Sequence, residues 1–360
     1  MNAKPLSEAI NTVKDPNLRK IYECLHDFDA ASVVKTRWRD KNSTSSLSFD
    51  FDTTPETVET IAAGLKRLFS LDDPNDIFIE KATQAGSGDG NEWRRMRTLH
   101  SSSLCALLHF WNISDHPFTI LLNETEITFS NVFFEVKNRV FEKPSNVDVV
   151  LTGTSENHNP VVFYLESKFS EYIMNSETGG SKFRKRGLVS SKYFKKEGFN
   201  MDALLGRLNL EKCKACDESY FFRWRNQCRE PEQWLYAEGI KQIIAHYLGV
   251  CNEIEQKFDK RGSNQQELAK LERDLKTDLY LGSVIFDFDE KNEKDAFSAK
   301  RDSFDSLYSL LASALNDLSQ PSRLHVVNHL LTYQDLQKAL QLSEKTRQFY
   351  YGDRNGRRLP

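Results

Sequence analysis

Long hydrophobic runs are missing from this 360-residue sequence. No stretch of about 18 apolar residues occurs, so we expect no membrane-spanning helix and no membrane partner. The first residues, MNAKPLSEAINTVKD, also lack the basic-then-apolar layout of a secretory signal. Cysteine is sparse, and six cysteines in a chain of this length indicate reduced thiols rather than a disulfide framework. These absences predict a cytoplasmic protein.

A large excess of charge is missing as well, since 49 Lys and Arg face 52 Asp and Glu, for a formal net charge of −3. The net charge therefore does not indicate a polyanionic partner, although a local basic face can still bind one. No internal repeat, Walker lysine pattern or nucleophile-elbow sequence is visible, which disfavours repeat arrays, NTP-binding loops and elbow-type hydrolases. The hydrophobic fraction of 39% and charged fraction of 28% are typical of globular proteins.

Two apolar segments joined by a polar loop stand out between Pro144 and Tyr172. They cover residues 147–151 and 161–169, and both are rich in β-branched and aromatic side chains. Residues 153–160 between them are turn-forming in character. The pattern predicts a β-hairpin.

Three charged residues interrupt this apolar hairpin: Asp148, Glu166 and Lys168. Such residues are costly in a strand unless they are paired, solvated or bound to metal. Glu166 and Lys168 share one face because strand side chains alternate, and Ser167 lies on the other. A hairpin centred on Asn157 places Asp148 opposite Glu166, with Cβ atoms roughly 4.5–5.5 Å apart. The two carboxylates repel unless a cation lies between them, and Mg²⁺, with oxygen ligands at about 2.0–2.1 Å, fits that gap.

The alternative is an Asp, Glu and Lys ion-pair cluster on the solvated face of a sheet, in a protein with a structural role. The long apolar strands, and the gathering of all three charges on one face, favour the metal site. Lys168 then stands beside the metal, where it can orient or help deprotonate an attacking water, or stabilise phosphate charge.

Asp148 followed by Glu166-Ser167-Lys168 resembles the core of the PD-(D/E)XK nuclease superfamily, which has the restriction-endonuclease-like fold. The resemblance implies that Asp148 and Glu166 hold Mg²⁺ (or Mn²⁺) and that Lys168 assists the hydrolytic water. It also implies that the backbone carbonyl of Ser167 completes the metal shell. A valine precedes Asp148 where the family's motif has proline.

The glycine-rich segment 86–90 precedes a helix that we expect from about Glu92 to Trp111. In the resembling superfamily the first helix often supplies an extra acidic residue to the catalytic site, and Glu92 is the candidate here. The arginines that follow Glu92 offer the alternative that it only pairs with them. Glu135, in a strand predicted over 132–141, is the rival for the third acidic ligand, but the simpler expectation for it is pairing with a nearby Lys or Arg.

A basic segment follows the hairpin, between residues 182 and 196, and it contains no acidic residue before Glu197. Seven cations beside a metal site suit contacts to a nucleic-acid backbone, and interleaved aromatic residues could stack on bases. The alternative is a solvated loop. The predicted nucleic-acid-binding residues here are Lys182, Arg184, Lys185, Arg186, Lys192, Lys195 and Lys196.

A helix predicted from Pro231 to Val250 carries Gln242 and His246 on one face. A Gln after the catalytic strands is similar to a further motif of the recombination-nuclease branch, which has Tyr four residues later. The resemblance assigns Gln242 to the catalytic site, whereas His246 holds the Tyr position and is otherwise an ordinary histidine. Lys241 is a predicted phosphate contact.

Three thiols, Cys213, Cys216 and Cys228, suggest a zinc site, but a fourth ligand at suitable spacing is not obvious. Unlinked thiols are the simpler expectation.

The order helix, strands, Asp148 strand, Glu166 strand, helix, strand matches the core of the resembling fold over roughly residues 86–290. We therefore predict an α/β protein with a central mixed β-sheet flanked by helices, and helical N-terminal and C-terminal additions. The expected divisions are a helical N-terminal extension (1–75) packed on the core, a nuclease-like domain (76–345) and a flexible basic tail (346–360). Other expected elements are helices 17–28, 56–69, 302–315 and 332–342, and strands 77–79, 118–129, 279–288 and 324–327.

The leading hypothesis is a Mg²⁺-dependent DNA endonuclease, restriction-like or otherwise defensive. The GSGDG segment, the serine-rich start of the first helix and the ESKF segment are similar to those of a group of bacterial restriction-endonuclease-like proteins. The alternative is a non-catalytic nucleic-acid-binding protein that kept the fold. DNA versus RNA, endo- versus exonucleolytic cleavage and a homodimer stay open.

Overall fold

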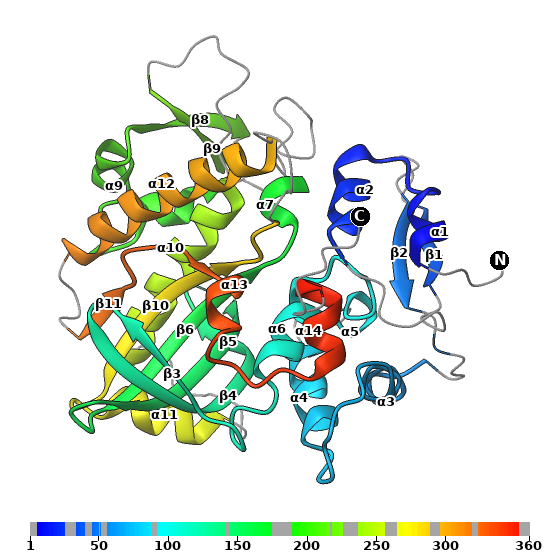
Figure 1. Cartoon of the computed structure of the whole chain (residues 1–360). Coiled ribbons are helices and arrows are strands. Elements are labelled where there is room, and N and C mark those ends of the chain that lie inside the picture. Colours follow the sequence, from blue (N-terminus) through cyan, green and yellow to red (C-terminus); the bar gives the residue numbers. More distant parts are fainter. Residues whose placement is uncertain are drawn as a thin grey trace.

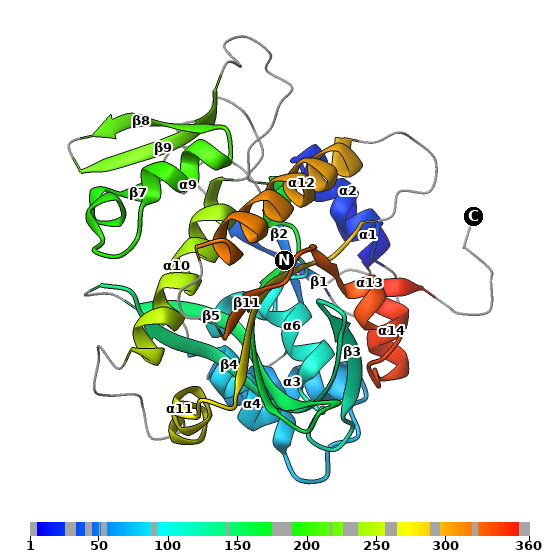
Figure 2. The same ribbon diagram turned by 90° about the vertical axis from the view of Figure 1, so that its left-hand side faces the viewer.

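The computed structural model places helices around a central mixed sheet, so the predicted α/β class is confirmed (Figures 1 and 2). It describes residues 6–25, 34–39, 45–49, 51, 56–87, 92–141, 144–174, 189–216, 218–225, 237–255, 265–288, 296–318 and 323–352. Within those ranges, no helix combines the length and apolar character that a membrane crossing needs.

Seven strands form the central sheet, in the order β11-β10-β6-β5-β4-β3, with β12 also paired to β10. Strands β3 to β6 pair antiparallel in sequence order, whereas β10 runs parallel to β6, β11 and β12. Their bounds are β3 Phe118–Leu122, β4 Thr125–Arg139, β5 Pro144–Ser155, β6 Pro160–Lys168, β10 Asp278–Ile285, β11 Leu324–Val326 and β12 Leu331–Thr332.

The β5–β6 hairpin has the predicted register. Val149 pairs with Leu165 and Gly153 with Val161, so the pairing is symmetric about position 157. The pairing ends at Val149 and Leu165, and Asp148 and Glu166 are the residues next to this last pair. The predicted hairpin centre is therefore confirmed.

The predicted boundary between strands 118–129 and 132–141 is wrong. Strand β4 runs unbroken through it, and the turn lies earlier, at Asn123 and Glu124, which both have left-handed φ angles, of 45° and 70°. An irregularity in the β4–β5 pairing between Phe129 and Asn131 takes the place of the expected break. An asparagine in a turn tolerates the left-handed conformation, which a sequence pattern of alternating side chains does not reveal.

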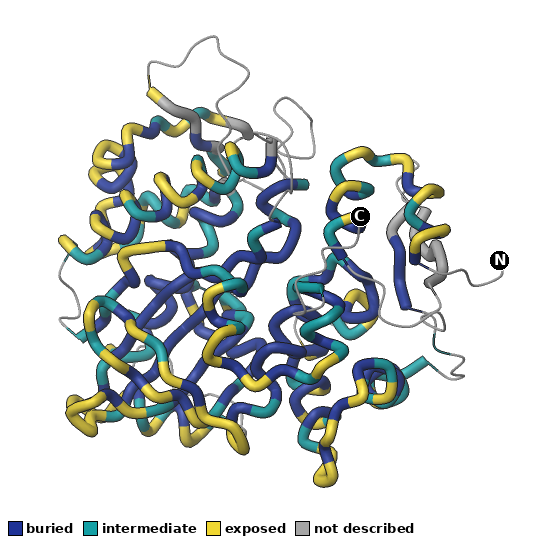
Figure 3. Tube along the Cα trace, in the orientation of Figure 1, coloured by how far each residue is buried: buried dark blue, intermediate teal, exposed yellow. Residues whose placement is uncertain are grey.

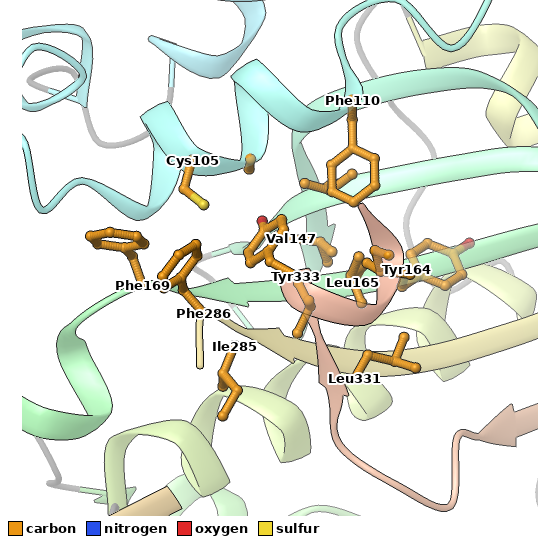
Figure 4. Packing of buried hydrophobic residues seen from close by; sticks show 14 of the residues in the cluster. Cys105, Phe110, Val147, Tyr164, Leu165, Phe169, Ile285, Phe286, Leu331 and Tyr333 are labelled. Carbon is orange, nitrogen blue, oxygen red and sulfur yellow. The ribbon is translucent and has the colours of Figure 1, made fainter. Parts of the chain in front are cut away.

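Two helices lie against the sheet near the hairpin. Helix α6 (Ser102–Phe110) contacts β5 and β6. Figure 4 shows its Cys105 and Phe110 near Tyr333, Val147 and Leu165. Helix α10 (Ala237–Ile254) contacts β4, β5, β6 and β10. Val147 and Leu165 alternate with Asp148 and Glu166, so the acidic residues face away from the α6 cluster.

The N-terminal part contains helices and a two-stranded sheet that was not predicted. Its elements are α1 (Leu6–Ile10), α2 (Pro16–Glu23), β1 (Val34–Arg39), β2 (Ser45–Phe49), α3 (Val58–Leu68), α4 (Ile77–Ala85) and α5 (Glu92–Arg95). Figure 1 shows the β1–β2 pair beyond α5 and α6, away from the central sheet.

Two local predictions in this part are wrong. Residues 77–79 belong to helix α4 rather than to a strand, because the Asp73 carboxylate accepts hydrogen bonds from the N–H groups of Ile77 and Phe78. The helix expected from Glu92 to Trp111 is split into α5 and α6, because Ser101 adopts extended backbone and caps α6.

A small three-stranded sheet, in the order β7-β9-β8, lies at one end of the molecule, far from α3 and α14 (Figures 1 and 2). It accompanies the part of the chain that follows the hairpin. The elements of this part are α7 (Glu171–Met174), β7 (Val189–Ser190), the 3₁₀ helix η1 (Ser191–Lys195), α9 (Met201–Arg207), β8 (Leu210–Cys216) and β9 (Ser219–Trp224).

The C-terminal part ends in helices that pack into the core. Helices α11 (Gln266–Arg273) and α12 (Ala296–Asn316) precede β11, and α13 (Tyr333–Leu336) and α14 (Glu344–Tyr351) follow β12. The helix expected over 332–342 stops at Leu336, and the tail expected from 346 is helical as far as Tyr351. Phe349 packs edge-on against Phe69 at 5.6 Å, so burial of aromatic rings orders this segment. Figure 3 shows that the strands of the central sheet are mostly buried.

Candidate active site

The site lies on the neighbouring interior strands β5 and β6, towards the amino end of β5 and at the carboxyl end of β6. The structure brings Asp148, Glu166 and Lys168 together there, as predicted, on the sheet face opposite the α6 cluster. Only 1% of Glu166 and 6% of Lys168 is exposed, whereas Asp148 is partly exposed. Asp148 is thus the member of the three that solvent reaches most easily.

Both carboxylate oxygens of Glu166 are hydrogen-bonded. Oε1 accepts from Lys168 Nζ at 2.5 Å, and Oε2 accepts from His246 Nε2 at 2.5 Å. Burial alone would raise the pKa of Glu166, but the charges and hydrogen bonds of Lys168 and His246 outweigh it and bring the pKa to about 2. Glu166 is therefore ionised at neutral pH.

Asp148 is in the opposite electrostatic situation. Burial raises the pKa of its carboxyl well above the ordinary value, and the charges of Glu166 and Glu135 add to that, while Lys168 and the Ser167 N–H oppose it. Its Oδ2 accepts from the backbone N–H of Ser167 at 2.7 Å, the only hydrogen bond of this carboxylate within the described parts of the chain. A carboxylate whose surroundings disfavour its charge is one that a bound cation stabilises.

The donor set fits a hard divalent cation. The carboxylates of Asp148 and Glu166 are oxygen ligands of the kind that Mg²⁺ takes, and Mg²⁺ keeps several waters besides. Over the described residues, no ready-made set of three or more His, Cys, Asp or Glu side chains lies together as metal ligands. A cation here would therefore depend on Asp148, Glu166 and water.

Helix α10 supplies one residue, His246, that the sequence placed on the face of Gln242 but did not assign to the site. His246 is 1% exposed, and its Nδ1 lies 2.7 Å from Ser145 Oγ while its Nε2 bonds Glu166. Its spacing of four residues from Gln242 was the available signal, because such positions share a helix face.

The two other α10 residues that were predicted show different environments. The side-chain oxygen of Gln242 is buried and has no hydrogen-bond partner among the described residues. Such an acceptor is costly unless a donor reaches it, and it lies one helical turn from His246. Lys241 is partly buried, and burial lowers the pKa of its amine while Glu238 opposes the shift.

The two candidates for a third acidic residue are now distinguishable. Glu92 accepts a hydrogen bond from Ser103 Oγ at 3.1 Å and pairs with Arg95 at 3.4 Å, which matches the alternative that it satisfies its own arginines. Glu135 lies on β4 across from Asp148 by the strand register, is 8% exposed, and raises the pKa of Asp148 through its charge. Its φ of 50° is left-handed, a strained conformation for a glutamate within a strand.

The predicted basic segment is described only in its second half. Lys182, Arg184, Lys185 and Arg186 lie outside the described residues. Lys192 and Lys195 are exposed on η1, and Lys196 Nζ donates to Asn252 Oδ1 of α10 at 2.9 Å.

The aromatic residues of this half pack within the protein. Tyr193 meets Phe141 edge-on at 5.1 Å, and Phe194 meets Tyr220 at 5.0 Å. These two rings hold η1 on the fold, so base stacking by them finds no support in the structure.

The cysteine motif is described in part. Cys213 and Cys216 lie on β8, and Cys228 lies outside the described residues. The zinc alternative stays a prediction.

No family model matches this chain, and searches among curated proteins and among solved structures likewise return no match. The function must therefore be inferred from the residues of the site.

Proposed function

We propose that the protein is a divalent-metal-dependent nuclease that hydrolyses phosphodiester bonds of DNA, restriction-like or otherwise defensive. The observation that carries the proposal is the placement of Asp148 and Glu166 next to the last paired residues of the hairpin, close enough for their charges to interact, with the amine of Lys168 at 2.5 Å from Glu166. The order α6, β4, β5, β6, α10, β10 supports it, since it is the order expected of the PD-(D/E)XK-like core.

Asp148, Glu166 and the Ser167 carbonyl would hold Mg²⁺ or Mn²⁺. The metal, when bound, supplies charge neutralisation at the scissile phosphate and a lowered pKa for a water nucleophile. Asp148 is held in place by the Ser167 N–H, and it is the partly exposed member of the three residues.

Lys168 provides the proton donor of the site. Its amine donates to Glu166 and its charge acts on Asp148, so it stands where it can orient the attacking water or bond a phosphate oxygen. Gln242 adds a buried acceptor one turn from His246 that a water or a substrate donor can satisfy. The exposed Lys192 and Lys195 offer phosphate contacts beside α10, and Lys241 lies on that helix.

The second candidate is a nucleic-acid-binding protein that keeps the fold but does not cleave. One observation favours it: both oxygens of Glu166 are taken by Lys168 and His246, so the chain itself satisfies this carboxylate. A metal would have to share or displace one of these hydrogen bonds.

Plasmid cleavage separates the candidates. Supercoiled DNA is incubated with purified protein and Mg²⁺ or Mn²⁺, beside Asp148→Asn and Lys168→Ala variants and a Lys276→Ala control. Lys276 is exposed and lies just before β10, at the opposite end of that strand from the site. We expect the two site variants to lose roughly 10²–10⁴-fold in rate and the control to match wild type.

Equal cleavage by all four proteins would identify a contaminant and overturn the proposal. Binding of DNA that persists in EDTA, without cleavage under any condition, would favour the second candidate.

A further inference from the structure

The imidazole ring of His246 links two strands of the hairpin. Its Nδ1 lies 2.7 Å from Ser145 Oγ near the start of β5, and its Nε2 lies 2.5 Å from Glu166 Oε2 near the end of β6. His246 and Glu166 are each 1% exposed, so water cannot easily replace either bond. The ring is therefore a fixed bridge between the two strands that carry the site.

The partners determine how the ring is oriented. The Glu166 carboxylate accepts, so Nε2 donates in this bond. The Ser145 hydroxyl lies at hydrogen-bond distance from Nδ1 and holds the other side of the ring. Ser145 thus orients the ring so that its Nε2–H points at Glu166, as outer hydrogen bonds do for histidines at metal sites.

The ring also fixes the rotation of the Glu166 carboxylate. Oε2 accepts from His246, which directs Oε1 to Lys168. Without the His246 bond, the carboxylate could rotate and turn either oxygen to Lys168. This restraint favours metal binding, because a metal ligand must hold one oxygen in a fixed position next to Asp148.

The hydrogen-bonded chain Ser145–His246–Glu166 has the residue types of a serine-hydrolase triad. Ser145, however, does not lie where a nucleophilic serine lies in such enzymes. It lies within strand β5 and pairs with Asn138 of β4. Nucleophilic serines of α/β-hydrolases instead sit on a sharp strand-to-helix turn that exposes the hydroxyl. The hydroxyl therefore serves the ring rather than a substrate.

We propose that His246, oriented by Ser145, is a positioning residue that fixes the Glu166 carboxylate for divalent-metal binding. This inference rests on the proposed function, because it assigns Glu166 to a metal. It predicts that metal affinity depends on an N–H donor at position 246 and not on the bulk of the side chain there.

The test compares two substitutions of similar size. His246→Phe keeps a ring but has no donor, whereas His246→Gln offers a side-chain N–H near the position of Nε2. Mn²⁺ binding is measured by calorimetry on the full chain, without DNA, and thermal melts check folding. We expect His246→Phe to weaken Mn²⁺ binding 10–100-fold, His246→Gln to recover most of it, and Ser145→Ala to lose less than His246→Phe.

The outcomes are distinct. If wild type and His246→Phe bind Mn²⁺ equally tightly, the positioning role is overturned while the proposed metal site survives. Absence of Mn²⁺ binding by folded wild-type protein would overturn both. If His246→Phe does not fold, the His246→Gln and Ser145→Ala variants decide. His246→Gln keeps a donor, so a loss of Mn²⁺ binding as large as that of Glu166→Gln would refute a donor role for position 246. Labelling of Ser145 by a fluorophosphonate probe would overturn the assignment of its hydroxyl to the ring.

Discussion

Replacing Asp148 with asparagine should make the metal-free protein more stable while it removes the proposed activity. The reason is that Asp148 carries a charge that its surroundings disfavour: burial, Glu166 and Glu135 all raise the pKa of its carboxyl. An asparagine keeps the hydrogen bond from the Ser167 N–H, because its side-chain oxygen can accept it. The substitution therefore removes repulsion without removing the contact.

The size of the gain follows from the strand geometry. Directly opposed positions are about 5 Å apart, and two unit charges at that spacing repel by roughly 3 kcal/mol at an effective dielectric constant of about 20. Lys168 offsets part of this repulsion, since its charge lowers the pKa of Asp148. We expect a net gain of about 1–2 kcal/mol in the free energy of unfolding, which for 360 residues corresponds to a rise in Tm of about 1–3 °C.

The assay is a thermal melt at pH 8 in EDTA, repeated with Mn²⁺ and at lower pH. In EDTA the Asp148→Asn variant should melt above wild type. Saturating Mn²⁺ should reverse the order, because binding at 100-fold excess over Kd stabilises wild type by about 2.7 kcal/mol. A raised native pKa means that wild type loses stability as pH rises through it, so the difference in EDTA should shrink toward acidic pH.

Two results would refute this reasoning. One is a variant that melts below wild type in EDTA at pH 8, which would mean that the Asp148 charge is stabilising in the folded protein. The other is a difference that widens as the pH is lowered, which has the wrong sign for a carboxyl with a raised pKa.

Three other predictions concern the core, the sheet and the third acidic residue. Burial lowers the pKa of His109 to about 4, so the unfolded chain binds more protons than the folded protein between pH 6.5 and 4. The folded protein should therefore lose about 3 kcal/mol of stability as the pH falls through that range. Urea titrations at several pH values should show a smaller loss for His109→Gln. Gly153→Ala should destabilise by about 3 kcal/mol in urea titrations, because a Cβ there would lie 2.0 Å from a backbone oxygen of β4, whereas Gly206→Ala, with nothing within 4 Å, should be neutral or stabilising. In the plasmid assay Glu135→Gln should lower the cleavage rate at least tenfold, because Glu135 contributes to the charge around Asp148, whereas Glu92→Gln should not. Equal rates for the two variants would contradict the assignment of Glu135 as the third acidic residue of the site.

Short-range chain geometry made part of the site predictable. The alternation of side chains along a strand put Glu166 and Lys168 on one face, and a turn-forming loop centred on Asn157 set the hairpin register. Both features depend only on residues close together in sequence. The mixed sheet and its flanking helices were expected from the resemblance to the PD-(D/E)XK core, whose order of helices and strands the predicted elements match.

Local patterns failed where a single side chain or a fold-wide contact decided the backbone. Asp73 starts helix α4 by capping residues that otherwise read as a strand, and Ser101 starts α6 inside what reads as one long helix. The C-terminal segment expected to be flexible is helical because Phe349 and Tyr350 find apolar partners in the core.

By itself the sequence determined that two acids and an amine share an edge of a β-hairpin, because strand periodicity and turn chemistry act between near neighbours. Only the tertiary structure decided what surrounds them. His246 lies 80 residues from Glu166 and 101 from Ser145 in sequence, and it reaches both because α10 packs across β5 and β6. The protonation of Glu166 and Asp148 is likewise set by burial and by neighbouring charges, which exist only once the chain has folded.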